Sequence, residues 1–474
     1  MSQSHTPGIP LRERLAQPVD VAAIAVFRIV FGLVLLWEVV RFFSYGWIRS
    51  YYIDPPVHFT YPGFAWVQPL PGEWMYGFFA VMGLLALCVM VGFAYRLSMP
   101  LLTFGFWYWF LLEKARYQNH FYLIGLLALI LCCIPAHAAF SFDSWKKPET
   151  RRSTVPAWML WLLRFQIAIP FVYGGIAKIT PDWLRGEPMR IWLEEQAGLP
   201  VIGPWFTEEW VVYFFSYGGL IFDLVIIPLL IWRRTRVCAY CLALAFNLTN
   251  SQLFHIGIFP WFLIGATTIY FEPDWPRRVI RKLRGGIESA NSIAPQTGGR
   301  PRLSRGLCGA LIVYAALQCA IPFHHYLYPG PSVWSYEGEY FVWHMRLATK
   351  ISGIRFHVTD PQTGQSVVHD PNELLPLWQA DLMSVNPEMI RQYAHFLAER
   401  SSGQSGKRVE VRAEVLNSLN GREPQPLIDR QVDLAAIPFS IRPADWIVPL
   451  EDPLPGTWRP DPAVAARLLS ENPR

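Results

Sequence analysis

Long apolar stretches separated by short polar ones fill most of the chain before residue 324. Runs near the length that a bilayer requires, about 20 residues with some latitude, occupy residues 21–43, 74–94, 97–112, 121–140, 158–177, 210–232 and 307–323. A further block, 237–271, has 35 residues and as one helix would measure about 52 Å, against a hydrocarbon core about 30 Å thick. We therefore expect this block to cross twice, with a turn near residues 247–252. The pattern predicts about nine transmembrane helices.

The hydrophobic pattern changes after Phe323. Residues 351–359 and 408–415 alternate apolar and polar positions, as half-buried strands do. Asn386-Pro387, followed by EMIRQYAHFLAER, has the cap and first-turn proline of an amphipathic helix. We expect a polytopic α-helical membrane protein with a C-terminal α+β, β-rich domain outside the membrane.

Composition and the placement of charge support this fold class and orient it. Hydrophobic residues make up 52% of the chain and charged residues 16%, which is typical of neither a soluble nor a disordered protein. The positive-inside rule places three basic groups in the cytoplasm: Arg233, Arg234 and Arg236; Arg277, Arg278, Arg281, Lys282 and Arg284; and Lys146, Lys147, Arg151 and Arg152.

The predicted organisation follows from these spans and charges. It comprises a cytoplasmic N-terminus (1–20), a transmembrane catalytic domain of eight spans (21–272), a basic cytoplasmic linker (273–304), a last transmembrane helix (305–325) and an extracytoplasmic substrate-binding domain (326–474). The seven cysteines lie in apolar segments and none follows Cys319, so the outer domain cannot contain an internal disulfide. Cys238 and Cys241 form a C-x-x-C that opens an apolar helix, and we interpret it as packing.

Polar residues from separate segments reach the same predicted membrane face. His120 begins the fourth span, Lys178 ends the fifth, and Asn250, Gln252 and His255 lie at the turn of the 237–271 block. The outer domain lies on that face too. A site there would be roofed by the domain and open sideways to lipid, which suits a lipophilic reactant and a water-borne one together.

Each of these residues also has a structural interpretation. A lysine at a span end can be an anchor whose ammonium reaches water, and His120, Asn250 and Gln252 can be helix-end or helix–helix hydrogen bonders. One observation argues against the anchor role: the positive-inside rule favours lysine and arginine on the cytoplasmic side, and Lys178 is predicted to lie on the other side. Gly174 and Gly175, one turn before Lys178, also allow a close helix approach that would remove water from the amine.

Four charged residues lie inside predicted spans: Arg28, Glu38, Arg164 and Asp223. Charges at such positions are costly and need partners. We expect structural ion pairs, with Arg164 the one expected to touch a ligand.

Several stretches together resemble a known family. They are AVFRIVFG (25–32), PLPGEWMY (69–76), YWFLLEKARYQNHFYLIGLLA (108–128), GGIAKITPDWLRG (174–186), NSQLFHIGIF (250–259), EPDWPRRV (272–279), IPFHHYLYPG (321–330), WSYEGEYFVWHM (334–345) and MIRQYAHFLAER (389–400). In this order they resemble the vitamin K-dependent gamma-carboxylases, within the horizontally transferred transmembrane domain proteins.

The resemblance implies a coupled reaction without a metal. Reduced vitamin K, as phylloquinol or menaquinol, is deprotonated and takes up O2; the resulting strong base removes the gamma proton of a peptide glutamate, CO2 adds, and the quinol leaves as an epoxide. The family's catalytic lysine falls on Lys178 and its assisting histidine on His120. Its glutamate-binding segment falls on Trp343, His344 and Met345. We assign quinol binding to Asn119, Arg164, Asn250, Gln252 and His255.

The chain departs from the family pattern in places. Ala177 stands where the family commonly has a second lysine, and the outer domain is short and lacks cysteines, which resembles a prokaryotic homologue in a bacterial cytoplasmic membrane. The expected partners are a glutamate-containing peptide and the lipid bilayer, with no nucleic acid. Two alternatives remain: a quinol epoxidase without protein carboxylation, and a non-enzymatic membrane partner of an exported peptide.

Overall fold

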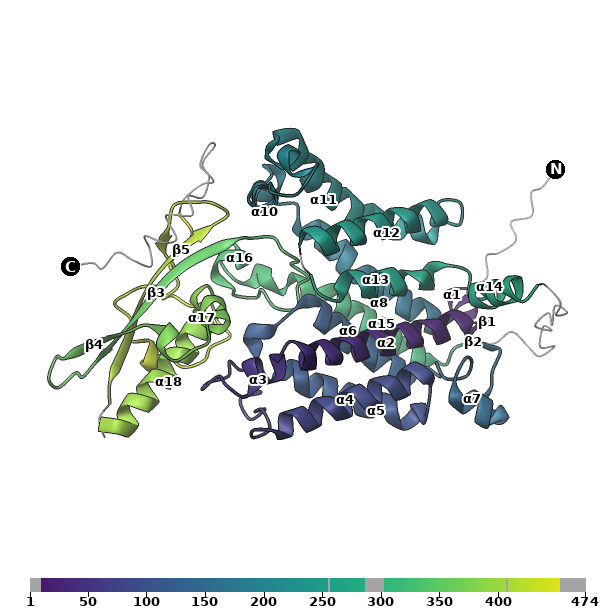
Figure 1. The fold of residues 1–474 in the computed structure, drawn as a ribbon, viewed down its shortest axis with the longest axis horizontal. Helices are drawn as coiled ribbons and strands as arrows, with labels where there is room; N and C mark the ends of the chain where they lie inside the picture. Colours follow the sequence, from purple (N-terminus) through teal and green to yellow (C-terminus); the bar gives the residue numbers. More distant parts are fainter. Residues whose placement is uncertain (1–9, 255, 286–301, 406–407, 452–474) are drawn as a thin grey trace.

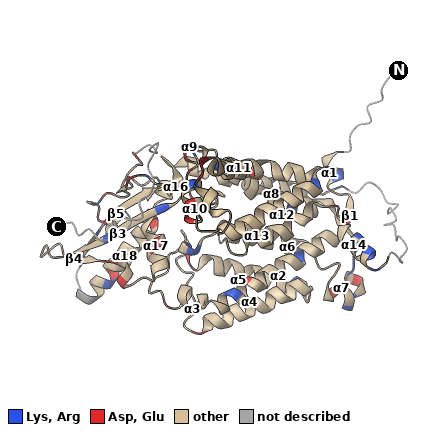
Figure 2. Ribbon diagram, turned by 45° about the horizontal axis from the view of Figure 1, so that its top comes forward, with Lys and Arg blue, Asp and Glu red and all other residues tan. Residues whose placement is uncertain are grey.

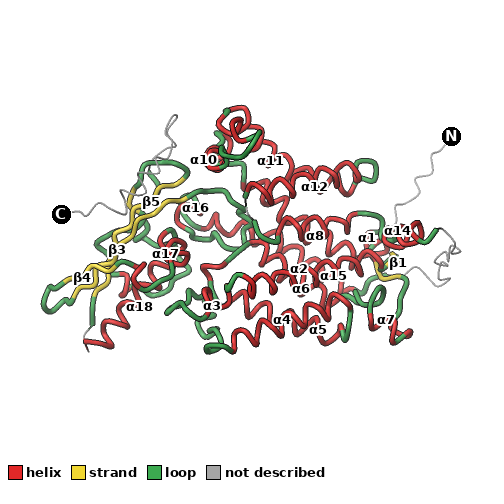
Figure 3. Tube along the Cα trace, viewed as in Figure 1, coloured by secondary structure: helices red, strands yellow, loops and turns green. Residues whose placement is uncertain are grey.

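The computed structural model describes residues 10–254, 256–285, 302–405 and 408–451. It contains a bundle of long helices and, at one end of the bundle, a smaller part built on a four-stranded sheet (Figure 1). Figure 3 makes the division visible, because the bundle is drawn almost entirely as red helix and the four yellow strands lie together beyond its end.

The bundle is formed by apolar helices. They are α2 (Ala22–Ser44), α4 (Trp74–Val91), α5 (Tyr95–Leu111), α6 (Asn119–Cys133), α8 (Ala157–Ala177), α11 (Glu209–Ile231), α12 (Arg236–Leu253), α13 (Phe259–Ala266) with η4 (Thr267–Tyr270), and α15 (Arg305–Ala320) with η5 (Ile321–Leu327). Among the described residues, five helices are long and apolar enough to cross a membrane: α2, α4, α8, α11 and α15 with its extension. The fold is that of a mainly helical membrane protein, while nine spans stay a prediction.

Two boundaries differ from those expected. Residues 247–252 are helical, and the turn in the 237–271 block comes later, between Leu253 and Phe259. The Asn247 amide does not break α12, because its Nδ2 donates to the carbonyl of Ala243 at 2.8 Å within the helix. The fourth predicted span ends at Cys133 rather than at residue 140, since Ile134 takes an extended conformation before Pro135.

A glycine sets the closest helix approach near the N-terminus. A Cβ atom on Gly32 of α2 would lie 2.6 Å from the backbone nitrogen of Met90 in α4. The two helices therefore pack with their backbones nearly in contact, and any larger side chain would force them apart.

The end of the bundle away from the sheet carries many of the basic residues. Two short strands, β1 (Pro18–Asp20) and β2 (Thr154–Pro156), pair there, close to α1 (Leu11–Arg14), α7 (Phe142–Lys146) and the basic helix α14 (Trp275–Leu283). Figure 2 shows blue ribbon at α1 and α14, while the long helices are mostly tan. The carboxylate of Asp20 in β1 forms an ion pair with the guanidinium of Arg277 in α14, at 2.9 Å, and so links these two segments.

The C-terminal part is an antiparallel sheet covered by two helices. Its strands β3 (Lys350–Thr359), β4 (Ser366–His369), β5 (Glu410–Leu419) and β6 (Gln425–Pro426) lie in the order β4-β3-β5-β6. Helices α17 (Leu377–Ser384) and α18 (Pro387–Ser405) pack against them, and Phe356 and Tyr393 are fully buried between sheet and helix. The predicted strands and helix are confirmed, and Asn386 caps α18 by accepting from the Met389 amide at 3.2 Å.

The segment between α8 and α11 contacts both the bundle and this domain. Residues 178–208 contain α9 (Pro181–Leu184), α10 (Met189–Glu195) and η3 (Gly203–Thr207), and they bury Trp183 and Leu193 against α11. Asp182 in α9 accepts two hydrogen bonds from the guanidinium of Arg422, at 2.7 and 2.8 Å. The loop after Lys178 is thus held between the bundle and the sheet domain.

Candidate active site

Lys178 and Asp223 form a buried ion pair between two long helices. Lys178 ends α8, and its Nζ lies 2.6 Å from Oδ2 of Asp223 on α11 and 3.1 Å from the carbonyl oxygen of Gly174. The exposed fractions are 7% for Lys178 and 5% for Asp223. The structure therefore places the lysine inside the protein with an anionic partner, and its ammonium does not reach water as an anchor's would.

The glycine pair before Lys178 allows this arrangement. A Cβ on Gly175 would lie 2.7 Å from Cδ2 of Leu224 on α11, so α8 and α11 approach closely there. A Cβ on Gly174 would lie 2.8 Å from Cε of Met345, a residue of the C-terminal part. The predicted close approach is confirmed, and it involves the C-terminal domain as well as a second helix.

Trp183 covers the lysine from the loop side. Its ring centroid lies 5.4 Å from Lys178 Nζ. The indole Nε1 donates to the Ser216 carbonyl at 2.8 Å, and the Ser216 hydroxyl donates back to the Trp183 carbonyl at 2.6 Å. Thr180 caps α9 by accepting from the Trp183 amide at 3.3 Å, so the ring is fixed at both ends.

A cavity of about 560 Å³ opens beside this pair. Its lining includes five of the predicted site residues: Lys178, His120, Asn119, Asn250 and Met345. Met345 and Arg346 extend into the lining from the C-terminal part. The rest of the wall is largely apolar and aromatic, with Phe171, Phe215, Phe246, Phe259 and Leu263.

His120 lies in the first turn of α6 and is buried. Its imidazole stacks on the ring of Phe259, with centroids 5.3 Å apart. Among the described residues, the imidazole contacts aromatic rings and neither ring nitrogen has a hydrogen-bond partner. Both nitrogens are therefore available to a ligand in the cavity.

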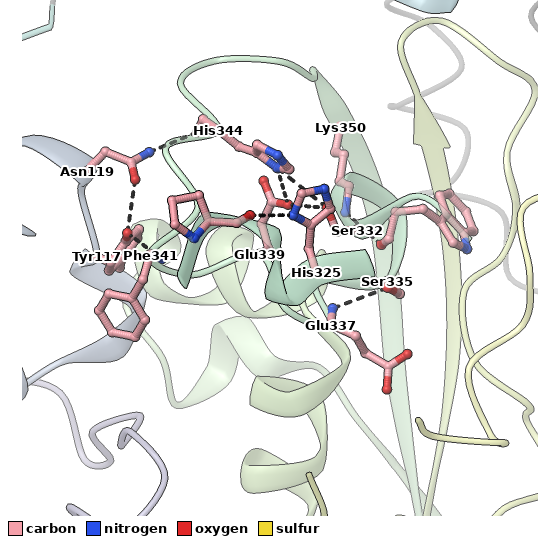
Figure 4. A network of polar contacts seen from close by, with 12 residues as sticks. Tyr117, Asn119, His325, Ser332, Ser335, Glu337, Glu339, Phe341, His344 and Lys350 are labelled. Carbon is pink, nitrogen blue, oxygen red and sulfur yellow. Dashed lines mark hydrogen bonds and ion pairs between the residues drawn. The ribbon is translucent and has the colours of Figure 1, made fainter. Parts of the chain in front are cut away.

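Asn119 joins the cavity to the C-terminal part (Figure 4). Its Nδ2 donates to the His344 carbonyl at 2.8 Å, and its Oδ1 accepts from the Tyr117 hydroxyl at 2.9 Å. The Tyr117 oxygen in turn accepts from the Phe341 amide at 2.8 Å. Both hydrogen bonds of the Asn119 amide are therefore committed to holding the segment that carries Met345.

That segment has unusual backbone geometry. Tyr336, Phe341, Trp343 and Arg346 have φ angles of 58°, 67°, 64° and 49°, in the left-handed region that side chains other than glycine rarely adopt. The turns so produced bury Trp343, which packs on Tyr122 with ring centroids 5.0 Å apart.

A polar cluster lies behind this segment. His344 Nδ1 is 2.8 Å from Glu339 Oε2, which also accepts from the Ser332 hydroxyl at 2.7 Å (Figure 4). The Lys350 amine nearby donates to the Trp334 carbonyl at 2.9 Å. Burial lowers the pKa of Lys350 to about 7, although the charge of Glu339 opposes the shift.

Two family models match the chain, and together they cover both parts. The HTTM domain matches residues 16–275. The vitamin K-dependent gamma-carboxylase, lumenal domain, matches residues 304–453. The chain belongs to the gamma-carboxylase-like HTTM family. No solved structure matches it.

Membership in the gamma-carboxylase-like family fixes the broad class of the protein. It is a membrane enzyme of carboxylase type, and vitamin K dependence comes with the lumenal-domain match. Lys178 and His120 lie within the first matched region and Met345 within the second. The cavity is therefore built from both matched domains.

The structure separates the other predicted site residues of this family member from the cavity lining. Trp343 is buried in the core, and His344 points its ring at Glu339. Gln252 is exposed, and its amide lies 3.4 Å from the Ser251 hydroxyl. His255 lies outside the described residues.

Arg164 differs from its expected role. Its guanidinium donates to the carbonyls of Ile269 and Phe271, at 2.9 Å each, and does not line the cavity. The expected ion pairs are confirmed for Glu38, with Arg41, and for Asp223. They are wrong for Arg28 and Arg164. Arg164 donates to carbonyls at the end of η4, whereas Arg28 donates to the Phe140 carbonyl through Nη2 alone, and its Nε and Nη1 have no hydrogen-bond partner among the described residues.

Sequence reasoning missed three cationic residues of the cavity of this gamma-carboxylase-like protein, Arg41, Arg116 and Arg346. It also missed the pairing of Asp223 with Lys178. A signal existed for Asp223, since an acidic residue inside a span needs a cation. Arg116 stands four residues before His120 in the family motif, and this proximity could have drawn attention to it.

Proposed function

We propose that the protein is a vitamin K-dependent gamma-glutamyl carboxylase that couples oxygenation of reduced vitamin K, to its epoxide, with carboxylation of a peptide glutamate. The observation that carries the proposal is the buried Lys178–Asp223 pair, which opens into a cavity lined by both matched domains. O2 and CO2 would be co-substrates.

The cavity fits a reduced naphthoquinone. Its volume of about 560 Å³ lies in the range of small-molecule sites, about 300–1,000 Å³. Aromatic side chains offer faces for a flat ring system, and Lys178, Asn250 and His120 supply a few polar groups at its edge. Bound reduced vitamin K would supply, on reaction with O2, the strong base that the gamma proton of glutamate requires.

Lys178 is assigned to proton removal from a quinol hydroxyl. A neutral amine has two N–H donors and one lone pair, and the two acceptors found here, Asp223 Oδ2 and the Gly174 carbonyl, match the two donors. The lone pair is then available to take a proton at Nζ. Asp223 would stabilise the resulting ammonium, because an adjacent negative charge favours the charged form of the amine.

His120 and Met345 are assigned to the glutamate end. The unpartnered imidazole nitrogens of His120 can accept or donate a proton beside the substrate, and Asn119 holds the Met345 segment as a roof. Excluding water matters because a strong base would otherwise be quenched before it met the glutamate.

The orientation in the bilayer is part of the same proposal. The basic residues at α1 and α14 favour a cytoplasmic location for that end, so the sheet domain would face the opposite side and receive an exported peptide. A reporter fused after Phe323 is expected to read as extracytoplasmic, and a cytoplasmic signal would overturn the orientation.

The test is a product assay on purified protein. The protein is given reduced vitamin K, O2, bicarbonate and a glutamate-rich peptide, and mass spectrometry measures both epoxide and carboxylated peptide. We expect both products from the natural sequence and from Lys146→Ala, an exposed control. Lys178→Ala should give neither product. Its circular dichroism spectrum should remain that of a folded helical protein, although its melting temperature should be lower because Asp223 loses its buried partner.

Each other outcome has a definite meaning. Epoxide without carboxylated peptide would replace the proposal by a quinol epoxidase. Peptide binding without either product, and independent of Lys178, would indicate a non-enzymatic partner of the peptide. Full turnover by Lys178→Ala would remove the lysine from the reaction.

A further inference from the structure

Arg116 carries a positive charge into the cavity; the Glu38 carboxylate is near enough to interact with that charge, but in the described residues it forms no ion pair with Arg116. It ends the short helix η1 (Lys114–Arg116), three residues before Asn119, and it lines the cavity. Its guanidinium carbon lies 4.1 Å from the ring centroid of Tyr51 and 6.0 Å from that of Trp378. Within the described parts of the chain, no carboxylate lies within ion-pair distance of this guanidinium and no acceptor takes a hydrogen bond from it.

The other charges of the cavity are compensated. Lys178 is paired with Asp223, and Arg41 with Glu38 at 2.7 Å. Arg346 donates to the Phe254 carbonyl at 2.8 Å. Arg116 is thus the cationic lining residue for which, among the described residues, neither a carboxylate within ion-pair distance nor a carbonyl acceptor is found.

Stacking also orients the Arg116 side chain. A guanidinium held over an aromatic face keeps its N–H donors at its edge, where a planar carboxylate can accept two parallel hydrogen bonds. Tyr51 belongs to α3 (Trp47–Tyr52) and Trp378 to α17, so the bundle and the sheet domain both position the group. A partly buried cation of this kind gains most from an anion that enters with the ligand.

We propose that Arg116 binds the side-chain carboxylate of the substrate glutamate. The inference rests on the proposed function, which supplies the peptide. It places the carboxylate of the glutamate at a residue four positions before His120 in the chain, in the cavity that His120 and Asn119 also line. The Lys178–Asp223 pair is then available to the quinol, so the quinol and the glutamate contact different polar groups of one cavity.

The first experiment measures binding without quinol. Protein in nanodiscs is titrated with a short glutamate peptide, with its glutamine counterpart and with bicarbonate, by calorimetry. For the natural sequence we expect the glutamate peptide to bind at least about 10-fold more tightly than the glutamine peptide, as a charge-assisted hydrogen-bond pair provides. Equal affinity for the two peptides would overturn the inference without any variant.

The second experiment compares arginine variants. Arg116→Gln should weaken glutamate-peptide binding by about 10- to 100-fold, and Arg116→Lys by less, because lysine keeps the charge but not the fork. Arg49→Gln is the matched control: Arg49 lies in α3, is exposed, and pairs with Glu73 at 2.9 Å outside the cavity lining. It should bind the peptide as the natural sequence does.

Kinetics then separates this inference from the proposed function. If the protein is active, Arg116→Gln should raise KM for the peptide more than it lowers kcat. Unchanged KM and unchanged peptide affinity, or loss of bicarbonate binding alone, would overturn the role of Arg116 while leaving the carboxylase intact. Arg116-dependent glutamate binding by a protein that forms no epoxide and no carboxylated peptide would overturn the proposed function alone.

Discussion

At the scale of single residues, the chemistry of Lys178 depends on a partner 45 residues away along the chain. A buried amine without an anion would favour its neutral form because burial penalises charge, whereas the carboxylate of Asp223 favours the ammonium. The two effects act on the same nitrogen in opposite directions. The proposed role of Lys178 as a general base needs both forms of the amine to be accessible.

Asp223→Asn tests this balance. The substitution keeps the size of the side chain and removes its charge, so the ammonium formed at Lys178 would lose its stabilisation. We expect the rate of epoxide formation at saturating quinol to fall by about 10²- to 10⁴-fold, the contribution typical of a positioned acid–base group.

The control for this prediction is Asp381→Asn, on the exposed side of α17, which should keep the natural rate. A rate for Asp223→Asn within a few-fold of that of the natural sequence would show that the lysine works without the aspartate.

The sequence predicts these residues unequally. Lys178 and Asp223 each attract attention separately, one by opposing the charge bias and the other by the cost of a charge inside a span. Their pairing depends on how α8 and α11 pack, which the pattern of each helix does not contain. Arg164 is a different case: the sequence predicts that it contacts a ligand, but its guanidinium donates to the carbonyls of Ile269 in η4 and of Phe271 directly after it.

At the scale of elements, the apolar runs locate the helices well and their ends less well. Long runs such as α2 and α11 begin and end within a residue or two of the prediction, because about 20 apolar residues have few alternatives to a helix. The turn after α12 comes later in the chain than the sequence predicts, because a polar side chain such as that of Asn247 can donate a hydrogen bond to a carbonyl of its own helix. Sequence polarity alone does not distinguish a turn from such a helix.

Gly175→Leu tests the contact between α8 and α11. The Cβ atom alone would lie 2.7 Å from Leu224, so the helices must separate and the Lys178–Asp223 distance must grow. We expect a loss of about 1–3 kcal/mol in the free energy of unfolding, as overpacking usually costs, together with loss of epoxide formation.

Gly218→Leu is the comparison within α11, because nothing lies within 4 Å of a Cβ placed there. It should leave both stability and turnover near their natural values. Equal effects of the two substitutions would mean that the close approach at Gly175 has no special role.

At the scale of the whole molecule, the bundle and the sheet domain are joined close to the active site. Asp182, four residues after Lys178, accepts from Arg422 and from Asn420, and Trp192 Nε1 donates to Thr349 Oγ1 at 2.6 Å. A displacement of the domain would therefore be felt at the end of α8. Sequence reasoning expected the domain beside the polar residues of the site, but it could not supply these contacts between distant segments.

Arg422→Ala tests the junction and its pH dependence. Burial alone would raise the pKa of Asp182, but hydrogen bonds from Arg422 and Asn420 and the charge of Arg422 hold it below its ordinary value. We expect a loss of about 2–5 kcal/mol, typical of truncating one partner of a buried charge pair, measured by denaturant unfolding at neutral pH.

The sign of the pH effect follows from the lowered pKa. A carboxylate whose pKa is depressed by folding contributes stability above its unfolded value, 3.8, and loses it as the pH falls through the folded value. The difference between the natural protein and Arg422→Ala should thus be constant near neutrality and shrink below about pH 4. Arg412→Ala, within β5 and with 42% of its side chain exposed, should show no such difference at any pH.

The left-handed residues between Tyr336 and Arg346 have a consequence for how this chain can change. Each costs roughly 1–3 kcal/mol that a glycine would avoid, yet aromatic and basic side chains stand at all four positions. Glycine would remove this backbone cost, but at Trp343 it would also leave a cavity where the buried ring packs on Tyr122, a loss of about 3–5 kcal/mol. The packing of this side chain thus offsets the strain at its own position, so glycine is not a neutral replacement there.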